Sequence, residues 1–361
     1  MDDQHYMQRC IDLARMGDGY VAPNPMVGAV LVYENRIIGE GFHKAYGGPH
    51  AEVNCLQSVN EKDKELIPVS TMYVSLEPCT HFGKTPPCAD LLIRHQVKRI
   101  VVGCRDPFLE VNGKGIEKLE SSGISVTTGV LEKECRELNK HFFTYHTEHR
   151  PYITLKWAQT ANGMIANEDY SRLMISNAFT NRLVHQWRSK HMGILVGTNT
   201  ALYDDPSLTT RLWPGKDAIR LVIDMHLRLP LHLKLFTSAP ATIVFNLLKH
   251  TDMPEDFLAY PQHTGPFYYQ VTEDVSLVHQ VLNALYQLKI QSVLVEGGAQ
   301  LLQSFIEEGC WDEAKIISNE SLILQAGLPA PGLKDHQLVQ SEKLDADIIN
   351  TYVPQRMSRS I

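Results

Sequence analysis

The sequence predicts two α/β domains in series. At 361 residues the chain is long for one hydrophobic core and sufficient for two. Apolar segments of strand length alternate with amphipathic helical segments in both halves, which is typical of layered α/β domains. A polar run, HTEHRP, ends at Pro151 and interrupts this alternation. We therefore expect one domain over residues 1–147 and a second over residues 148–361.

The first half has the element order β-β-α-β-α-β after an initial helix. Met7, Cys10, Ile11 and Ala14 recur at helical spacing and predict a helix over 4–16. The apolar runs 27–33, 36–42, 71–76 and 99–104 predict strands, and helices are expected after Pro49 and from Cys88. A helix over 113–123, a strand over 124–131 and one long helix over 131–149 complete this half. This order predicts a sheet covered by helices.

The second half restarts with an expected strand over 151–159, a loop over 162–171 and a helix over 179–190. The segment 193–202 reads as a strand that runs into a polar turn. Further strands are expected over 217–225, 241–245, 267–271 and 291–298, the last leading into a helix over 299–309, with final strands over 314–319 and 346–353.

Composition excludes several classes of protein. The net charge of −7 and the pI near 6.1 argue against a surface for nucleic acid. Seven cysteines without regular spacing favour a reducing compartment over a disulfide scaffold. Neither a signal peptide nor a long apolar run is present, so a soluble, cytoplasmic protein is expected, with no membrane partner. A homo-oligomer is compatible with the sequence, which leaves the oligomeric state open.

A zinc-ligand pattern lies in the first half. His50 and Glu52 form an H-x-E motif, and Pro78-Cys79 precedes Cys88 by a wide spacing. Zinc takes imidazole nitrogen and thiolate sulfur, and a catalytic zinc keeps one position for water. The H-x-E and P-C arrangement is the signature of zinc-dependent nucleobase deaminases, in which the glutamate moves protons and is no ligand. We expect one Zn²⁺, held by His50, Cys79 and Cys88, with Glu52 as the acid and base.

The alternative is a structural zinc site, which is normally closed by four protein ligands. Cys55, His81 and His43 are candidates for the fourth. A closed site has no use for a glutamate two residues from its histidine, whereas hydrolysis requires one. The pattern therefore favours a catalytic centre.

The motifs APNPMVGAV, GGPHAE, EPCTHFGKTPPC and the later Asp106-Pro107 resemble the deaminase half of the bifunctional deaminase/reductases of riboflavin biosynthesis. The resemblance covers nearly the whole chain. It implies a cytidine-deaminase-like three-layer α/β/α domain, followed by a dihydrofolate-reductase-like α/β domain that uses NADPH. It also implies that Asn24 binds the substrate ring. Two weaker candidates come from their positions in the chain: Lys84, in the turn between the two cysteines, for a substrate phosphate, and Asp106, at the end of an expected strand, where α/β sheets usually meet ligands.

In the second half, a strand that ends at Gly297-Gly298 and precedes a helix is by itself a weak sign of an anion site. The motifs LKWAQTANG, WRSK, VGTNTALYDDPSLTTR and VEGGAQLL resemble the family's reductase. Carried over by motif, the resemblance implies cofactor contacts for Ala158, Thr200, Asp204 and Gly298. It implies contacts with the ribosyl substrate for Arg188, Leu208, Arg211 and Glu296, and the two arginines suit a phosphate. No acid or base for the reduction is evident.

Three positions depart from the family pattern, which usually has Asp at Asn162 and Ser-x-Trp at Arg172-Leu173-Met174. Alternatives to the bifunctional enzyme follow: a deaminase with a degenerate second half, a nucleoside or tRNA deaminase, or a non-enzymatic zinc protein. The predicted chemistry is hydrolytic deamination of 2,5-diamino-6-ribosylamino-4(3H)-pyrimidinone 5′-phosphate, followed by NADPH reduction of its ribosyl chain to ribityl.

Overall fold

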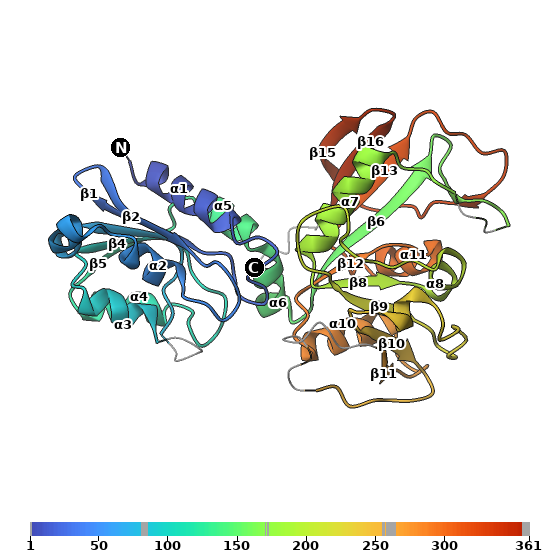
Figure 1. The fold of residues 1–361 in the computed structure, drawn as a ribbon, viewed down its shortest axis with the longest axis horizontal. Helices are drawn as coiled ribbons and strands as arrows, with labels where there is room; N and C mark the ends of the chain where they lie inside the picture. Colours follow the sequence, from blue (N-terminus) through green and yellow to red (C-terminus); the bar gives the residue numbers. More distant parts are fainter. Residues whose placement is uncertain are drawn as a thin grey trace. The chain divides into compact units, whose positions relative to one another are not determined.

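The protein folds into two compact units, Met1–His149 and Arg150–Ile361. We describe it from a computed structural model, over residues 2–80, 86–169, 171, 173–254, 257 and 265–355. Each unit has its own sheet and core, and Figure 1 labels their helices and strands. None of the helices in the described ranges combines the length and apolarity that crossing a membrane needs.

The first unit contains a five-stranded mixed sheet in the order β2-β1-β3-β4-β5. β1 pairs with β2 and β3 in antiparallel fashion, whereas β3, β4 and β5 are parallel. The strands are β1 (Gly28–Tyr33), β2 (Arg36–Phe42), β3 (Thr71–Leu76), β4 (Arg99–Cys104) and β5 (Ser125–Thr128). The helices are α1 (Asp3–Arg15), α2 (Ala51–Gln57), η1 (Glu61–Val69, 3-10), α3 (Cys88–Arg94), α4 (Lys114–Ser121), α5 (Glu132–Leu138) and α6 (Lys140–Glu148).

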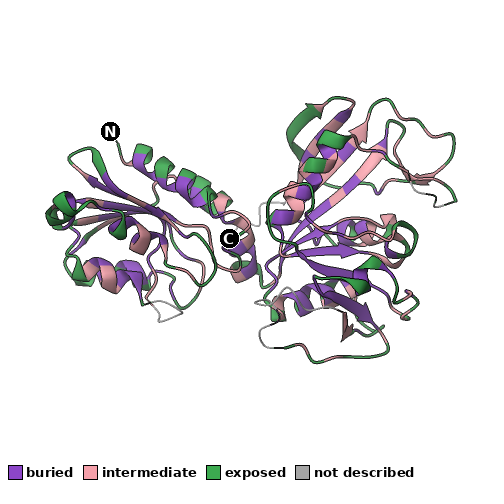
Figure 2. Cartoon of the chain, in the orientation of Figure 1, coloured by how far each residue is buried: buried purple, intermediate pink, exposed green. Residues whose placement is uncertain are grey.

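Two hydrophobic clusters, one on each face of this sheet, make the unit a three-layer α/β/α domain. One cluster contains Met7 and Ile11 of α1 and Cys135 of α5, and the other contains Leu56 of α2, Leu92 of α3 and Leu119 of α4. Strand residues alternate between them, as the period of two in a pleated strand requires. Figure 2 shows the central strands of both sheets buried and the outer faces of the helices exposed. The predicted fold class is confirmed.

One expectation for this unit is wrong: the long helix over 131–149 is two helices, α5 and α6. They are separated at Asn139, whose φ of −112° and ψ of 26° are not helical. The Asn139 side chain is buried and bonds the backbone of Met26, accepting from its amide at 2.7 Å and donating to its carbonyl at 2.8 Å. A side chain that bonds distant backbone competes with the helix, and here it ends one helix and begins another.

The second unit contains a nine-stranded sheet in the order β11-β10-β9-β8-β12-β6-β13-β16-β15. The strands from β11 to β13 are parallel, and β16 and β15 are antiparallel. They are β6 (Tyr152–Thr160), β8 (Gly193–Val196), β9 (Ile219–Ile223), β10 (Thr242–Asn246), β11 (Pro266–Gln270), β12 (Ser292–Val295), β13 (Glu313–Asn319), β15 (His336–Leu344) and β16 (Asp347–Pro354).

Helices cover both faces of this sheet. α10 (Leu277–Gln287) and α11 (Ala299–Glu307) contribute to one core cluster, while α8 (Thr198–Asp204) and α9 (Lys234–Thr237) contribute to another on the opposite face. α7 (Ala178–Lys190) packs Val184 against Ile317 and Ile349. Since parallel strands end at the same edge of a sheet, the loops after β8, β9 and β12 meet there.

The expected strands of this unit are present, but four elements differ from the expectation. The loop expected over 162–171 contains the strand β7 (Met164–Ala166), which pairs with β14 (Leu328–Pro329). The polar turn expected after β8 is the helix α8. The helix α10 and the exposed edge strand β15 were not expected from the sequence. β7 pairs with the distant segment β14, so local periodicity does not show it. β15 pairs with the neighbouring β16 but is exposed along nearly its whole length, so it lacks the alternation of apolar and polar residues that marks a half-buried strand.

Candidate functional sites

The three predicted zinc ligands come from two helix starts and one strand end. His50 immediately precedes α2, Cys79 follows β3, and Cys88 is the first residue of α3. α2 lies directly against β2: a Cβ at Gly41 would lie 2.3 Å from the backbone nitrogen of Cys55. Asn54 donates to the carbonyls of Phe42 at 2.8 Å and Pro49 at 3.2 Å, which fixes the loop before His50.

The side chains of His50, Cys79 and Cys88 converge. His50 Nδ1 lies 3.5 Å from Cys79 Sγ and 3.4 Å from Cys88 Sγ, and all three ligand atoms lie within 4.8 Å of one another. With bonds of about 2.1 Å to nitrogen and 2.3 Å to sulfur, a tetrahedral zinc separates such atoms by about 3.5 Å. The distances therefore fit a shared zinc ion.

The candidates for a fourth zinc ligand were Cys55, His43 and His81. Neither Cys55 nor His43 belongs to this group, and in the described part of the chain no fourth His, Cys, Asp or Glu joins it. His81, like Lys84, lies outside the described residues. The described arrangement is a three-ligand set, which is the form that catalytic zinc sites take.

The electrostatics of this cluster favour a thiolate. A hydrogen bond from Cys88 and the proximity of His50 lower the pKa of Cys79. The backbone amide of Cys88 also lies 3.4 Å from Cys79 Sγ and donates to it. Thiolate is the form that binds metal, so the donor set suits zinc chemically as well as geometrically.

Glu52 lies in the first turn of α2 and is 3% exposed. Its Oε2 atom makes no hydrogen bond with any described residue. Burial, together with the charge of Cys79, raises the pKa of its carboxyl. A buried carboxylate oxygen without a partner is costly in a static protein, so an unpaired one beside a metal-ligand set indicates a functional group.

Asn24 is held beside this cluster by His43. His43 is 2% exposed, and its Nδ1 lies 3.0 Å from the carbonyl of Pro49. Because a carbonyl only accepts, Nδ1 donates, and Nε2 accepts from Asn24 Nδ2 at 3.1 Å. Burial lowers the pKa of His43, which favours this neutral form. The ring of His43 also stacks edge-on at 5.5 Å from that of His50, which places Asn24 near the ligands.

Asp106 follows β4 in a loop that Glu77 organises. The buried carboxylate of Glu77 accepts from the amides of Asp106, Gly113 and Gly115 at 3.2, 3.0 and 2.9 Å. Burial raises the pKa of Asp106 to about 7. Glu77 thus fixes the loop around Asp106.

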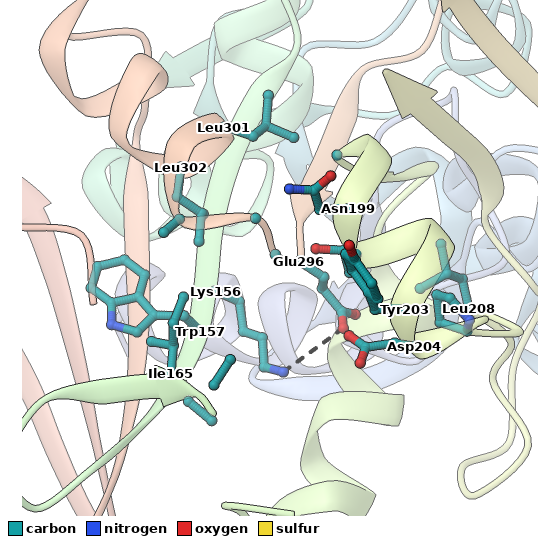
Figure 3. A pocket seen from close by; sticks show the side chains of 18 of the residues that line it. Lys156, Trp157, Ile165, Asn199, Tyr203, Asp204, Leu208, Glu296, Leu301 and Leu302 are labelled. Atoms are coloured by element: carbon teal, nitrogen blue, oxygen red, sulfur yellow. Dashed lines mark ion pairs between the residues drawn. The ribbon is translucent and has the colours of Figure 1, made fainter. Parts of the chain in front are cut away.

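The second unit has a cavity of about 900 Å³ at the carboxyl ends of its parallel strands. Figure 3 shows side chains from several strands and helices around it. All eight residues that the resemblance indicated for the reductase line this cavity: Ala158, Arg188, Thr200, Asp204, Leu208, Arg211, Glu296 and Gly298.

Glu296 is the centre of the charged groups in this cavity. It accepts from Arg188 Nε at 2.6 Å and Nη2 at 2.8 Å, and Lys156 Nζ lies 3.8 Å away. Burial by itself would raise the pKa of Glu296, but Arg188 and Lys156 lower it to about 2. Burial lowers the pKa of Lys156. Figure 3 shows Lys156 pointing toward Glu296.

Lys156 is the residue that the sequence analysis missed. It lies between the buried residues Leu155 and Trp157 on β6, and its side chain is 15% exposed. A lysine inside an apolar strand is itself a signal, because burying an ammonium group costs free energy unless a partner or a function compensates. Its partner, Glu296, is 140 residues away along the chain.

The Gly297-Gly298 turn connects β12 to α11 and packs closely against Thr200. Both glycines have positive φ, 127° and 79°, and a Cβ at Gly297 would lie 3.1 Å from the Thr200 side chain. Larger residues would therefore strain the backbone and crowd Thr200. The turn leaves the amino end of α11 open to the cavity, where an anion is favoured.

The residues at the positions that depart from the family pattern fit their surroundings in the described part of the chain. Asn162 Oδ1 accepts from Thr160 Oγ1 at 2.8 Å, and its Nδ2 donates to the carbonyl of Leu324 at 2.7 Å. Leu173 and Met174 line the cavity, and Met174 is 64% exposed. Arg172 lies outside the described residues.

A second group of potential ligands, His279, Glu308 and Cys310, lies on the second unit. Glu308 there accepts from Ser276 Oγ at 2.5 Å and already has a protein partner. Glu308 also lies 3.4 Å from His279 Nε2, so its carboxylate is already engaged, unlike the Oε2 atom of Glu52.

The comparisons with known proteins match each half of the chain to a known domain family. Residues 1–104 match the cytidine and deoxycytidylate deaminase zinc-binding region, and residues 151–349 match the RibD C-terminal domain. The chain belongs to the RibD family. It is a bifunctional enzyme of riboflavin biosynthesis, with a zinc-binding deaminase domain and a reductase domain of the NADPH-using type.

Relatives of the RibD family match along most of their length. The chain is 42% identical to riboflavin biosynthesis protein RibD of Aquifex aeolicus, covering 86% of this chain and 85% of that protein. It is 34% identical to the Escherichia coli RibD protein, over 87% and 86%. The solved Thermotoga maritima diaminohydroxyphosphoribosylaminopyrimidine deaminase/5-amino-6-(5-phosphoribosylamino)uracil reductase has 35% identity, a TM-score of 0.84 and 98% coverage of both chains.

Proposed function

We propose that the first unit deaminates 2,5-diamino-6-ribosylamino-4(3H)-pyrimidinone 5′-phosphate and that the second unit reduces the ribosyl chain of the product to ribityl. The convergence of His50, Cys79 and Cys88 beside the buried Glu52, whose Oε2 atom makes no hydrogen bond with any described residue, carries the first assignment. The cavity around Lys156 and Glu296 supports the second. The substrate is a small phosphorylated pyrimidine, and the net charge of −7 disfavours nucleic acid.

In the deaminase, His50, Cys79 and Cys88 would hold zinc, which when bound supplies a Lewis acid that makes water nucleophilic near neutral pH. Glu52 takes a proton from the attacking water and returns it to the amino group that leaves as ammonia. The buried Oε2 atom has no described protein partner, so it is available for this transfer. Asn24, oriented by His43, presents its amide to the substrate ring.

In the reductase, NADPH when bound supplies the hydride. Hydride addition to C1 of the opened ribosyl chain also requires a proton at the neighbouring nitrogen. Lys156 holds a proton at Nζ inside the cavity, and the carboxylate of Glu296 keeps that ammonium group in place. Lys156 is the proton donor that the sequence analysis did not identify.

The remaining cavity residues fall into two groups, one for the cofactor and one for the substrate. Ala158, Thr200, Asp204 and Gly298 would contact the cofactor, with its pyrophosphate at the amino end of α11. Leu208, Arg188, Arg211 and Glu296 would contact the substrate. Arg188 is already paired with Glu296 and the carbonyl of Thr209, whereas the Arg211 side chain makes one hydrogen bond among the described residues, to Thr209 Oγ1 at 3.5 Å. Arg211 is therefore the better candidate for the substrate phosphate.

The experiment is a stepwise assay of the full chain. Ammonia release is measured with the phosphorylated pyrimidinone, cytidine and adenosine, and NADPH oxidation is then followed with the deaminated product. Activity on the pyrimidinone alone supports the proposal, and activity on cytidine or adenosine contradicts it. Ammonia release without NADPH oxidation indicates a degenerate reductase, and bound zinc without ammonia indicates a non-enzymatic zinc protein.

A further inference from the structure

The cavity of the second unit is lined by five cationic side chains, and three of them have a carboxylate partner. Lys156 and Arg188 pair with Glu296, and Lys234 pairs with Asp205. The other two, Arg211 and Arg228, make no ion pair with any residue in the described ranges. Two cations in one cavity therefore remain for anionic groups of ligands.

The proposed function supplies two separate phosphate ends. The substrate carries a 5′-phosphate, and NADPH carries a phosphate on the adenosine 2′ oxygen that NADH lacks. Since a guanidinium binds phosphate through paired, charge-assisted hydrogen bonds, each arginine can take one such group. With Arg211 proposed to bind the substrate phosphate, Arg228 remains for the phosphate at the adenosine end of the cofactor.

The sheet topology places Arg228 at that end. β6, β12, β8 and β9 are parallel neighbours in that order, which Figure 1 shows. Ala158 and Lys156 are on β6, the Gly298 turn follows β12, and Arg228 follows β9. At about 4.8 Å per strand, β9 lies roughly 14 Å from β6. A dinucleotide with its pyrophosphate at Gly298 and its nicotinamide near β6 therefore extends its adenosine toward the loop after β9.

That loop holds the backbone of Arg228 in place and leaves its side chain exposed. The buried carboxylate of Asp224 accepts from the amides of Arg228 at 3.0 Å and Leu229 at 2.9 Å. Leu229 is 7% exposed and anchors the loop in the core. Thr198, at the start of α8, donates to the carbonyl of Ile223 at 2.6 Å and ties this loop to the end of β8. A fixed loop that presents to the cavity a guanidinium with no ion-pair partner among the described residues is suited to recognition of an anionic ligand group.

We infer that Arg228 binds the 2′-phosphate of NADPH and makes the reductase prefer NADPH over NADH. This inference rests on the proposed reductase function and adds a specificity-determining residue to it. The same guanidinium adds little to NADH binding, because NADH has only hydroxyl groups on that ribose.

The test compares Arg228→Ala and Arg228→Lys with the wild-type full chain. Dissociation constants for NADPH and NADH are measured by fluorescence titration, and KM for the deaminated substrate is measured at saturating cofactor. We expect Arg228→Ala to weaken NADPH binding on the order of 10- to 100-fold while NADH binding changes little. Arg228→Lys should retain part of the preference for NADPH over NADH, because lysine keeps the positive charge. The control is Arg182→Ala, which removes an equal charge from an arginine stacked on Trp213 outside the cavity.

Each other outcome overturns the inference. An unchanged preference for NADPH, or an equal loss of affinity for both cofactors, removes Arg228 from 2′-phosphate recognition. A raised KM for the substrate with unchanged cofactor preference assigns Arg228 to the substrate phosphate instead. A wild-type chain that binds neither cofactor defeats the proposed reductase itself, which distinguishes that failure from a failure of Arg228 alone.

Discussion

Arg188 and Glu296 form a two-pronged ion pair that joins α7 to the end of β12. Nε to Oε1 is 2.6 Å and Nη2 to Oε2 is 2.8 Å, and the side chains are only 12% and 4% exposed. The pair therefore neutralises two charges that the cavity would otherwise bury, and removing one partner leaves the other uncompensated.

This ion pair predicts acid sensitivity. The pKa of Glu296 falls from 4.5 to about 2 on folding. A carboxyl whose pKa is lowered by folding adds stability above its unfolded pKa, and this contribution is lost as the pH falls through the folded value. The contribution, roughly 3 kcal/mol at neutral pH, should disappear between pH 4.5 and about 2. Urea unfolding across this range measures the free energy of unfolding of wild type and of Glu296→Gln, and the difference between the two should shrink as the pH falls. A difference that stays constant with pH would contradict this prediction.

Lys156→Met should abolish most of the reduction while leaving cofactor binding in place. Methionine fills similar space but holds no proton, so NADPH oxidation should fall on the order of 100- to 10,000-fold. NADPH titration and NADPH oxidation with deaminated substrate measure the two effects. Deaminase activity of the same variant is the internal control, and undiminished NADPH oxidation would exclude Lys156 as the proton donor.

Glu52→Gln should abolish deamination and leave zinc bound. The amide has nearly the same shape but cannot take a proton, so ammonia release should fall at least 100-fold, a typical loss for a general base. Metal content by atomic emission and ammonia release by a coupled assay test the two parts. Undiminished turnover would sink this role, and reduction of separately supplied deaminated substrate should be unaffected.

Cys79→Ser and Cys88→Ser should each lose zinc, because a hydroxyl is a poor substitute for a thiolate ligand. The matched control is Cys310→Ser, since Cys310 belongs to the second ligand group on the other unit. Wild type and Cys310→Ser should each hold one zinc per chain. Equal zinc loss in the control would show that the second group binds zinc as well.

Asn162→Asp restores the residue usual in the family and should cost stability here. The Nδ2 atom of Asn162 donates to the carbonyl of Leu324, and an aspartate would place an acceptor against that carbonyl. The expected loss is about 1 kcal/mol, measured by urea unfolding, with cofactor binding unchanged. A large gain in NADPH affinity would instead show that Asn162 weakens the cofactor site.

Local sequence carried much of the fold and of the first site. Strand and helix periodicity predicted the β1 to β5 sheet, and the H-x-E motif with two cysteines indicated a zinc set whose members converge in the structure. The helix break at Asn139 was missed because its cause is the distant backbone of Met26. Secondary-structure propensities along the chain do not take such long-range hydrogen bonds into account.

The sequence by itself determined the types of metal ligand and the glutamate that serves as acid and base beside them. It also determined that the chain has two domains and that the second carries the motifs of a reductase family. Only the tertiary structure decided which charges meet. Lys156 and Glu296 are distant in sequence, and parallel pairing of β6 and β12 places them 3.8 Å apart. The same sheet leaves Arg228 without a carboxylate among the described residues while Arg188 gains one. Charge pairing depends on through-space distance, which residue order does not specify.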